Sequence, residues 1–332
     1  MLLAVDIGNT NIVFGLFEGA RLLTHFRLET RKARTEDEYA ALLSSLLQLH
    51  GLPFRATAAP EPEASELAAG AGPLAPSARS DSTTSGDHGA AEEGGRGKRV
   101  VSGAERPGRP DGSDPAHLQP LSAQTGERGI SAGILATVVP PVLAAFQRLF
   151  QRYLGLDPVI VGPGTRTGMP ILYDNPREVG ADRIINAVAA YERYRSGCLV
   201  VDFGTATTFD VVTPKGEYLG GAIAPGIGIS ADALFHAAAK LPRVELLRPR
   251  SVIGKNTVSS MQSGLVYGYV GLVDGIVERM RAEVDFPLRV VATGGLAALL
   301  ARDSRTIEDC DEMLTLTGLR IIYDREQRRG PR

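Results

Sequence analysis

An apolar run that ends at an aspartate and a glycine occurs at two distant places in the chain. The first copy reads AVDIGNT and ends at Thr10, and the second reads VVDFGTATT and spans residues 200–208. A carboxylate at the end of a buried strand is costly unless a donor or a cation pairs with it. Because an apolar segment resumes after each turn, each copy is typical of two strands joined by a hairpin. The repeat predicts an α/β chain with duplicated halves and a cleft between them.

The segments around these turns alternate between strand and helix patterns. In the first half we expect strands at residues 2–6, 12–17 and 21–28 and a helix at 35–50. Thr35 and Glu38 have the spacing of a capping box at the start of that helix. Further strands are expected at residues 133–139, 158–161, 198–203, 207–212, 218–223 and 288–292, and further helices at 141–153, 183–195, 230–239, 259–283 and 296–302.

Residues 53–128 differ in composition from the rest of the chain. They are rich in Ala, Gly, Pro, Ser, Glu and Arg, and Phe54 is their only aromatic residue. Such a segment cannot bury enough apolar surface to offset the entropy that it loses on ordering. We therefore predict a disordered insertion within the first of two halves, which we place at residues 1–140 and 141–332.

Composition and charge exclude several classes of protein. The net charge is −2, whereas nucleic-acid and membrane-surface binders carry a basic excess. Cys198 and Cys310 form no CxxC motif, which is typical of reduced thiols, and the five histidines have no zinc-ligand spacing. No apolar stretch approaches the length of a membrane span, and Asp6 would interrupt a signal sequence. We expect a soluble, cytoplasmic protein that binds neither nucleic acid nor membranes.

The two acidic turns carry the groups that bind a polyphosphate. A glycine lets the backbone approach a phosphate, the hydroxyls and backbone N–H groups can donate to it, and the carboxylate can hold a metal ion or its water. Either turn alone is equally consistent with an ordinary Asp/Gly hairpin. Their occurrence at the ends of matching strands favours a nucleotide site. VATGGLA at residues 291–297 is a third, weaker candidate, since a Gly-Gly turn can lie flat against adenine or ribose.

The segment YDNPREVGADR, residues 173–183, is polar between two apolar segments. Asp182 falls at the start of a predicted helix, where the helix dipole favours an ionised carboxylate. Arg183 can form paired hydrogen bonds to a carboxylate or a phosphate. The alternative is that Asp182 and Arg183 form a helix cap and a surface ion pair, and that Tyr173 belongs to the core.

Two further segments have few charges. GGAIAPGIGIS at residues 220–230 is typical of a close-packed loop that lines a pocket or an interface. IGKNTVSSMQSG at residues 253–264 leads into a long, mostly uncharged helix. That helix is consistent with a core element or with a dimer contact, and we favour a subunit interface.

Taken together, these motifs resemble the type III pantothenate kinase family. AVDIGNTN, TVVPP, NPREVGADR, VDFGTATTFD, GGAIAPGI, KLPRVEL, IGKNTVSSMQSG, ATGGLA and LTLTGLRIIYDR occur in the family's order and cover the chain apart from residues 53–128. The resemblance implies the duplicated RNase H-like fold of the acetate and sugar kinase, Hsp70 and actin superfamily. It also implies phosphorylation of pantothenate by ATP, the first committed step towards coenzyme A.

The resemblance assigns nucleotide and ion contacts to the two turns. Asp6 would hold the water shell of Mg²⁺, Thr10 and Asn11 would contact the phosphates, and Asp202 would bind a monovalent cation, K⁺ or NH₄⁺. The implied ATP-binding residues are Asp6, Ile7, Gly8, Asn9, Thr10, Asn11, Ile12, Val13 and Thr205.

The resemblance also assigns the acceptor site. Asp182 would take the proton from the primary hydroxyl of pantothenate. The implied pantothenate-binding residues are Tyr173, Gly180, Ala181, Asp182, Arg183 and Thr257. Family members act as homodimers with residues of both subunits near the substrate pocket.

Departures from the family pattern are few, and two other functions stay open. Members usually lack the insertion, and Thr137 stands where serine is frequent. Another small-molecule kinase of the superfamily would carry the same phosphate turns, so only the acceptor residues favour pantothenate. A non-catalytic regulator that binds nucleotide is the second alternative, and the acid at Asp182 argues against it.

Overall fold

The first five-stranded sheet contains the N-terminal acidic turn. A computed structural model describes residues 1–54 and 129–328, so nearly all of the insertion predicted at 53–128 lies outside the described residues. The strand order is β3-β2-β1-β4-β5; β1, β2 and β3 are antiparallel neighbours, whereas β4 and β5 run parallel to β1. The strands are β1 (Leu2–Ile7), β2 (Asn11–Glu18), β3 (Arg21–Glu29), β4 (Ala132–Thr137) and β5 (Val159–Val161).

The second sheet repeats the first in strand order and direction. Its order is β8-β7-β6-β9-β10, with β6, β7 and β8 antiparallel and β9 and β10 parallel to β6. The strands are β6 (Cys198–Phe203), β7 (Ala206–Val212), β8 (Tyr218–Pro225), β9 (Arg289–Thr293) and β10 (Asp309–Cys310). Asp6 and Asp202 each occupy the penultimate residue of the central strand. The duplicated α/β fold expected from the sequence is confirmed.

Helices on the outer face of the first sheet bury its largest side chains. Helix α1 (Glu36–Leu49) begins with the predicted capping box of Thr35 and Glu38, and α2 (Pro140–Leu149) continues into a short π-helix, η1 (Phe150–Leu154). Tyr39 and Phe146 pack with ring centroids 4.8 Å apart in this core. Strand β5 follows α2 and still pairs with β4, so a boundary at residue 140 would separate β5 from its own sheet.

Two helices pack in a core that takes residues from both sheets. These are α3 (Ala181–Tyr194) and α7 (Leu314–Gln327). Their buried side chains cluster with Ala4 of the first sheet and Val200 of the second. A Cβ built on Gly318 of α7 would lie 2.3 Å from the carbonyl oxygen of Ile185, so glycine allows the two helices to approach closely.

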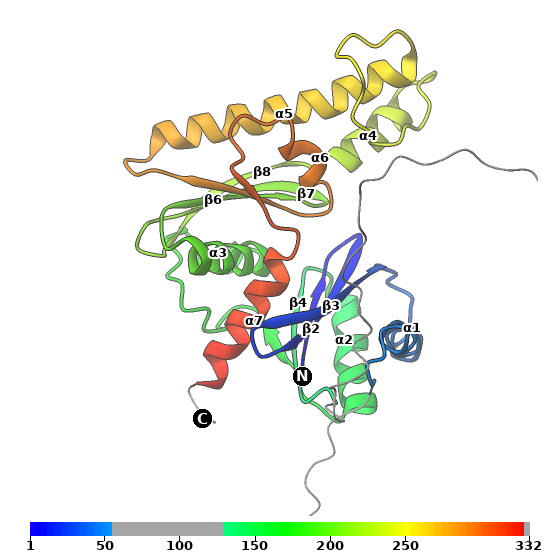
Figure 1. Ribbon diagram of the computed structural model, residues 1–332, viewed down its shortest axis with the longest axis vertical. Helices are drawn as coiled ribbons and strands as arrows, with labels where there is room; N and C mark the ends of the chain where they lie inside the picture. Colours follow the sequence, from blue (N-terminus) through cyan, green and yellow to red (C-terminus); the bar gives the residue numbers. More distant parts are fainter. Residues whose placement is uncertain (55–128, 329–332) are drawn as a thin grey trace, which may run out of the picture. The chain divides into compact units, whose positions relative to one another are not determined.

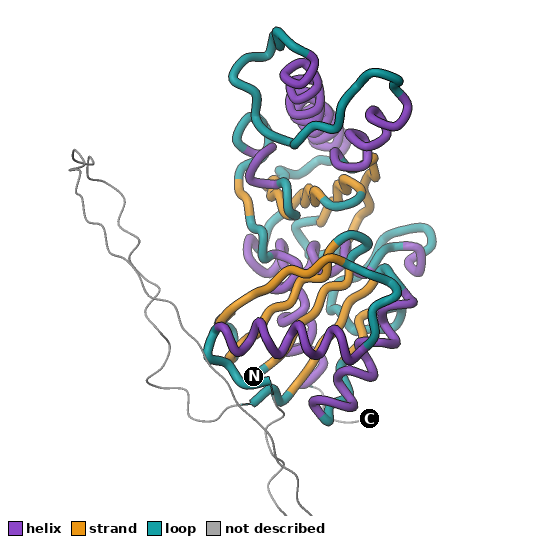
Figure 2. Tube along the Cα trace, turned by 90° about the vertical axis from the view of Figure 1, so that its right-hand side faces the viewer, coloured by secondary structure: helices purple, strands orange, loops and turns teal. Residues whose placement is uncertain are grey.

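The opposite face of the second sheet is covered mainly by α5 (Thr257–Glu283), which crosses the strands in Figure 1. Figure 2 shows helices on both faces of the strands. The remaining helices are η2 (Pro176–Glu178), α4 (Ile227–Ala237) and α6 (Ala297–Ala301). Among the described residues, no helix is long and apolar enough to cross a membrane.

Candidate functional site

The two acidic turns meet through their threonines. Thr10 Oγ1 and Thr205 Oγ1 lie 3.0 Å apart, although the residues belong to different sheets. Each turn is closed by a hydrogen bond from its glycine: Gly8 N–H donates to the carbonyl of Asn11 and Gly204 N–H to that of Ala206, both at 3.0 Å. The turns therefore have similar local geometry and face each other, as the sequence repeat predicts.

Neighbouring carboxylates raise the pKa values of Asp6 and Asp202. Burial, followed by the charges of Asp182 and Asp202, raises the pKa of Asp6 to about 8. Burial, with the charges of Asp182 and Asp210, raises the pKa of Asp202 to about 7, while a hydrogen bond from Asn186 opposes the increase. Such a concentration of acid favours a bound cation, because a cation stabilises the ionised carboxylates.

The carboxylate of Asp182 is held against the first turn of α3. Its Oδ1 accepts a hydrogen bond from the backbone N–H of Arg183 at 2.9 Å. A Cβ on Gly180 would lie 2.5 Å from the same oxygen, so the preceding residue must be small for this arrangement. Burial raises the pKa of Asp182, and the Arg183 amide and guanidinium act against that increase. A carboxylate with a raised pKa is better suited to accept a proton near neutral pH.

Asp202 is fixed by a chain of hydrogen bonds from both helices of the shared core. Thr315 of α7 donates to Asn186 Oδ1 at 2.7 Å, and Asn186 Nδ2 donates to Asp202 Oδ2 at 3.0 Å. Gly294 has φ = +92° and a Cβ there would lie 2.6 Å from Asp202 Oδ1. The ATGG turn therefore lies directly against this carboxylate, and only glycine suits both its backbone angle and the space.

A buried ion pair lies behind Asp182. Arg183 Nε donates to Asp210 Oδ1 at 2.7 Å, and Arg183 Nη2 lies 2.7 Å from the same oxygen without a hydrogen-bond acceptor of its own. Tyr218 and Thr208 donate to the two oxygens of Asp210 at 2.7 and 3.0 Å. The network fixes the Arg183 side chain at the start of α3, with its Nη2 buried beside Asp210.

Tyr173 lies beside this network. Its ring centroid is 6.4 Å from that of Tyr218, and a Cβ on Gly220 would be 3.6 Å from Tyr173 Cδ2. A Cβ on Gly221 would lie 1.7 Å from the carbonyl oxygen of Phe209 and 3.1 Å from Arg183 Nη2. The two glycines of β8 thus provide the space that Tyr173 and Arg183 occupy, and Tyr173 packs partly against the core.

The predicted ATP-binding segment divides into buried and exposed residues. Ile7 and Ile12 are fully buried in the core, so only their backbone groups can contact a ligand. Asn9, Thr10 and Asn11 are exposed at the turn. Gly8 is partly buried, and its carbonyl accepts a hydrogen bond from Thr30. Val13 is partly buried against the shared core and lies beside Asp6 in register.

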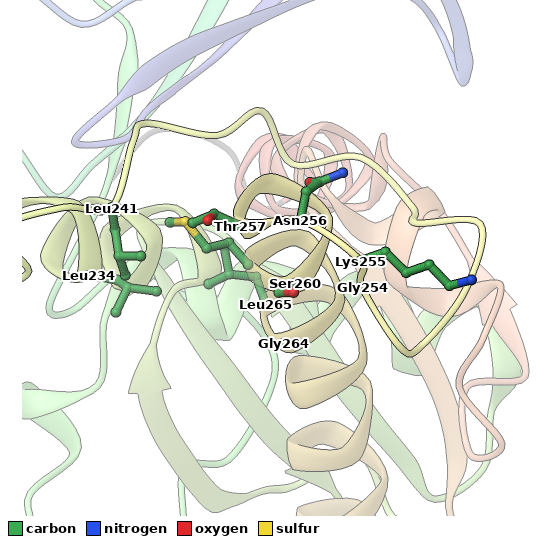
Figure 3. A pocket seen from close by; sticks show the side chains of 10 residues that line it. Leu234, Leu241, Gly254, Lys255, Asn256, Thr257, Ser260, Gly264 and Leu265 are labelled. Atoms are coloured by element: carbon green, nitrogen blue, oxygen red, sulfur yellow. The ribbon is translucent and has the colours of Figure 1, made fainter.

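Thr257 lies apart from the other predicted site residues. It begins α5 and lines a cavity of about 750 Å³ with residues of α4 and of the following loop. Figure 3 shows Leu234 and Leu241 on one side of this cavity, with Lys255 extending away from them. The cavity lining includes none of the other predicted site residues.

A metal ion here would need ligands beyond the protein. In residues 1–54 and 129–328, no group of three or more His, Cys, Asp or Glu side chains has the geometry of a metal site. Mg²⁺ commonly keeps several waters and binds through one or two carboxylates together with substrate phosphates. The acidic side chains at the turns fit that mode of binding.

Several residues of the site were not predicted from the sequence. Asn186 lies outside the quoted motifs, and Thr315 lies in the closing LTLTGLRIIYDR motif, to which no site role was assigned. Asp210 had a readable signal, because an acid among the apolar residues of a strand requires a partner. Nothing in the sequence around Tyr218, at the start of β8, indicated that its hydroxyl would donate a hydrogen bond to Asp210.

Comparisons with known proteins agree with the sequence resemblance. A family model described as type III pantothenate kinase matches residues 2–63 and 96–279. A type III pantothenate kinase of Myxococcus xanthus is 48% identical over 325 residues, covering 98% of each chain. One from Geobacter sulfurreducens is 46% identical over 327 residues, covering 98% of this chain and 100% of the relative.

A more distant likeness exists to a solved structure. An activator of 2-hydroxyisocaproyl-CoA dehydratase from Clostridium difficile, solved with bound ADPNP, aligns with a TM-score of 0.43 at 10% identity. The alignment covers 100% of this chain and 98% of that one. A likeness this low supports no statement about function.

Proposed function

Because the chain belongs to the type III pantothenate kinase family, we propose that its two acidic turns hold the phosphates of ATP while Asp182 orients the acceptor hydroxyl. The protein is a kinase that phosphorylates pantothenate with ATP, the reaction that starts coenzyme A biosynthesis. The observation that carries the site assignment is the meeting of the turns at Thr10 and Thr205 beside carboxylates that raise the pKa of Asp6.

The turns supply donors for the polyphosphate. Gly8 and Gly204 let the backbone come close to the ligand, and Thr10 and Thr205 carry hydroxyls that can donate to phosphate oxygens. Phosphoryl transfer needs little covalent chemistry from the protein, so positioning and charge stabilisation account for most of the catalysis. One ligand that bridges both turns would also hold the two halves in a fixed relation.

The acidic residues fit two cations. We assign Asp6 to the water shell of Mg²⁺ and Asp202 to a monovalent cation, either K⁺ or NH₄⁺. When bound, these ions would neutralise the negative charge of the phosphates, which the carboxylates cannot do because they are negative themselves. Asn186 and the Gly294 turn keep Asp202 in place, which supports a fixed ion site there.

Asp182 is the residue we assign to the acceptor hydroxyl. Burial raises its pKa, which makes the carboxylate a stronger base, and its hydrogen bond from the Arg183 amide fixes the direction of the carboxylate. In a loose transition state the proton leaves late, so a large part of its effect is orientation.

Pantothenate carries a carboxylate and an amide, which need donors. The positive charge of Arg183 and the partly exposed Tyr173 support a pantothenate site at the start of α3, with Gly180 and Ala181 forming its backbone. Asp210 holds the Arg183 guanidinium in one rotamer, so its positive charge stays at the start of α3.

In a homodimer, Thr257 of one subunit would reach the pantothenate site of the other. Thr257 lies in a separate cavity, which Leu234 also lines, and large apolar side chains are exposed on β8, α4, the following loop and α5. Exposed apolar surface commonly marks a protein interface. We propose that Thr257 of one subunit completes the pantothenate site of the other. The exposed apolar residues are Leu219, Ile223, Ile229, Leu234, Leu247, Val252, Ile253 and Val258.

We place the division between the two halves after β5, because β4 and β5 share a sheet.

We propose that the enzyme acts in the cytoplasm. We propose no role for membranes or nucleic acid, in keeping with the net charge of −2.

A coupled assay of ADP release tests the function. Purified protein with ATP and pantothenate is expected to release ADP, and K⁺ or NH₄⁺ is expected to increase the rate. Release with a different hydroxylated substrate, and none with pantothenate, would indicate another small-molecule kinase. ATP binding without turnover on any acceptor in a substrate panel would indicate a regulator instead.

A further inference from the structure

Arg27 shares one row of the first sheet with Asp6. Residue pairing places Asp6 opposite Val13 and Val13 opposite Arg27. Residues directly opposite each other on neighbouring strands point to the same face of a sheet. Arg27 therefore lies on the face that carries Asp6, two strands away, or about 10 Å by the usual strand spacing.

The Arg27 guanidinium reaches the other half of the molecule. A Cβ built on Gly295 would lie only 2.7 Å from Arg27 Nη1 and 3.7 Å from Arg27 Cζ. Gly295 follows Gly294, whose turn lies against Asp202. The second glycine of ATGG thus leaves the space that this side chain occupies, and Arg27 extends from β3 to the turn beside Asp202.

Arg27 has no acidic partner in the part of the chain that the structure describes. Two other arginines do: Arg31 pairs with Glu29 and Arg183 with Asp210, each at 2.7–2.8 Å. Arg27 is exposed, and the charged groups that act on Asp6 are both carboxylates. Its positive charge is therefore not used to neutralise the protein's own acids.

These observations point to a use for that charge. We propose that Arg27 binds the polyphosphate of the nucleotide between the two acidic turns, which makes it a nucleotide-binding residue in addition to those of the turns themselves. The proposal rests on the proposed function, in which ATP occupies this place. A guanidinium presents paired donors that match phosphate oxygens. The Arg27 side chain extends from the strand row that contains Asp6 to the Gly294–Gly295 turn, where a bound polyanion needs positive charge.

The planar guanidinium could instead stack on the adenine, and binding measurements separate the two roles. Equilibrium binding of ATP, ADP and adenosine is measured by calorimetry on the wild type, Arg27→Ala and Arg27→Lys. We expect Arg27→Ala to weaken ATP and ADP binding by about 10- to 100-fold and adenosine binding by less than about 2-fold. Arg27→Lys is expected to recover part of the affinity, since it keeps the charge but loses the paired geometry.

Arg21→Ala is the matched control, since Arg21 is an exposed arginine at the other end of the same strand. It is expected to leave all three affinities unchanged, and unfolding midpoints verify that both variants fold. Equal ATP affinity in Arg27→Ala and Arg21→Ala, while the wild type binds ATP and phosphorylates pantothenate, would overturn the proposal. An equal loss for adenosine would assign Arg27 to the base and overturn it as well.

A wild type that binds no ATP would refute the proposed function before any variant is compared. That result is distinguishable from a failure of Arg27 alone, because the latter leaves wild-type binding intact.

Discussion

The hydroxyl oxygens of Thr10 and Thr205 lie 3.0 Å apart, although 195 residues separate them in the sequence. Each belongs to the acidic turn of its own sheet, and the sheets have the same strand order. Duplication thus places two equivalent turns opposite each other. In the function we propose, a single nucleotide contacts both halves through these turns, and the acceptor binds at the start of α3.

Asp182→Asn should reduce turnover far more than nucleotide binding. Asparagine keeps the size of the side chain but accepts no proton, so we expect kcat to fall by about 10²–10⁴-fold. The KM for ATP should change by less than about 3-fold, because Asp182 faces the acceptor. Steady-state kinetics check this, with Asp174→Asn as a control in the same segment. An equal effect of both substitutions would show that Asp182 only shapes the pocket.

The stability of the ligand-free protein should decrease as pH rises from about 5.5 to about 8.5. The pKa of Asp6 is about 8 and that of Asp202 about 7 when folded, whereas an unfolded Asp titrates near 3.9. Between these values the folded state binds more protons, so deprotonation favours unfolding. Each carboxyl contributes a slope of at most about 1.4 kcal/mol per pH unit.

Asp6→Asn should flatten that dependence. Urea unfolding at several pH values measures the slope, and Asp285→Asn, at an exposed acid, is expected to behave like the wild type. A wild-type free energy of unfolding that does not fall with pH, or an Asp6→Asn slope equal to it, would contradict the electrostatic description of the site.

Asp210→Ala should destabilise the fold by about 3–5 kcal/mol, because it leaves Arg183 charged, buried and without a partner. The double variant Arg183→Met with Asp210→Leu should recover most of that loss, since a buried pair is often replaceable by apolar residues. Its KM for pantothenate should nevertheless rise, because the positive charge at the start of α3 is gone. Chemical unfolding and kinetics test the two halves of this prediction. A double variant with normal pantothenate affinity would remove Arg183 from the site.

Mixing two inactive variants should restore activity if the pantothenate site is shared between subunits. A subunit with Asp182→Asn and one with Thr257→Val can form a mixed dimer in which one site has both native residues. We expect activity after unfolding and refolding the two together, to about one quarter of the wild-type level by random pairing. Activity no higher than the sum of the separate samples would place Thr257 outside the partner's site.

The sequence predicted the strands and turns well because their signals are local. The apolar runs ending at Asp6 and Asp202, and the capping box of Thr35, depend on neighbouring residues and needed no tertiary information. The duplication of the fold followed from the repeat.

Helix α7 was missed for a physical reason. Leu314 and Leu316 alternate with β-branched Thr315 and Thr317, which resembles a strand. The helix packs with α3 and the first sheet, and its charged residues, including the Arg320–Asp324 pair, begin only at Arg320, so its first turns show no amphipathic pattern. Tertiary packing overrides its weak local preference.

The least predictable parts of the site depend on contacts between distant segments. Asp210 pairs with Arg183, and Arg27 reaches Gly295, through the fold alone. The separation of Thr257 from Asp182 is also invisible in a linear sequence, although the family motifs contain both.

Amide hydrogen exchange with a non-hydrolysable ATP analogue tests the central claim most directly. If both turns bind one nucleotide, the amides of residues 8–11 and 204–206 should be protected together, at the same analogue concentration. Asp6→Asn should weaken protection in both segments. Protection of one turn while the other exchanges as in the free protein would contradict the account.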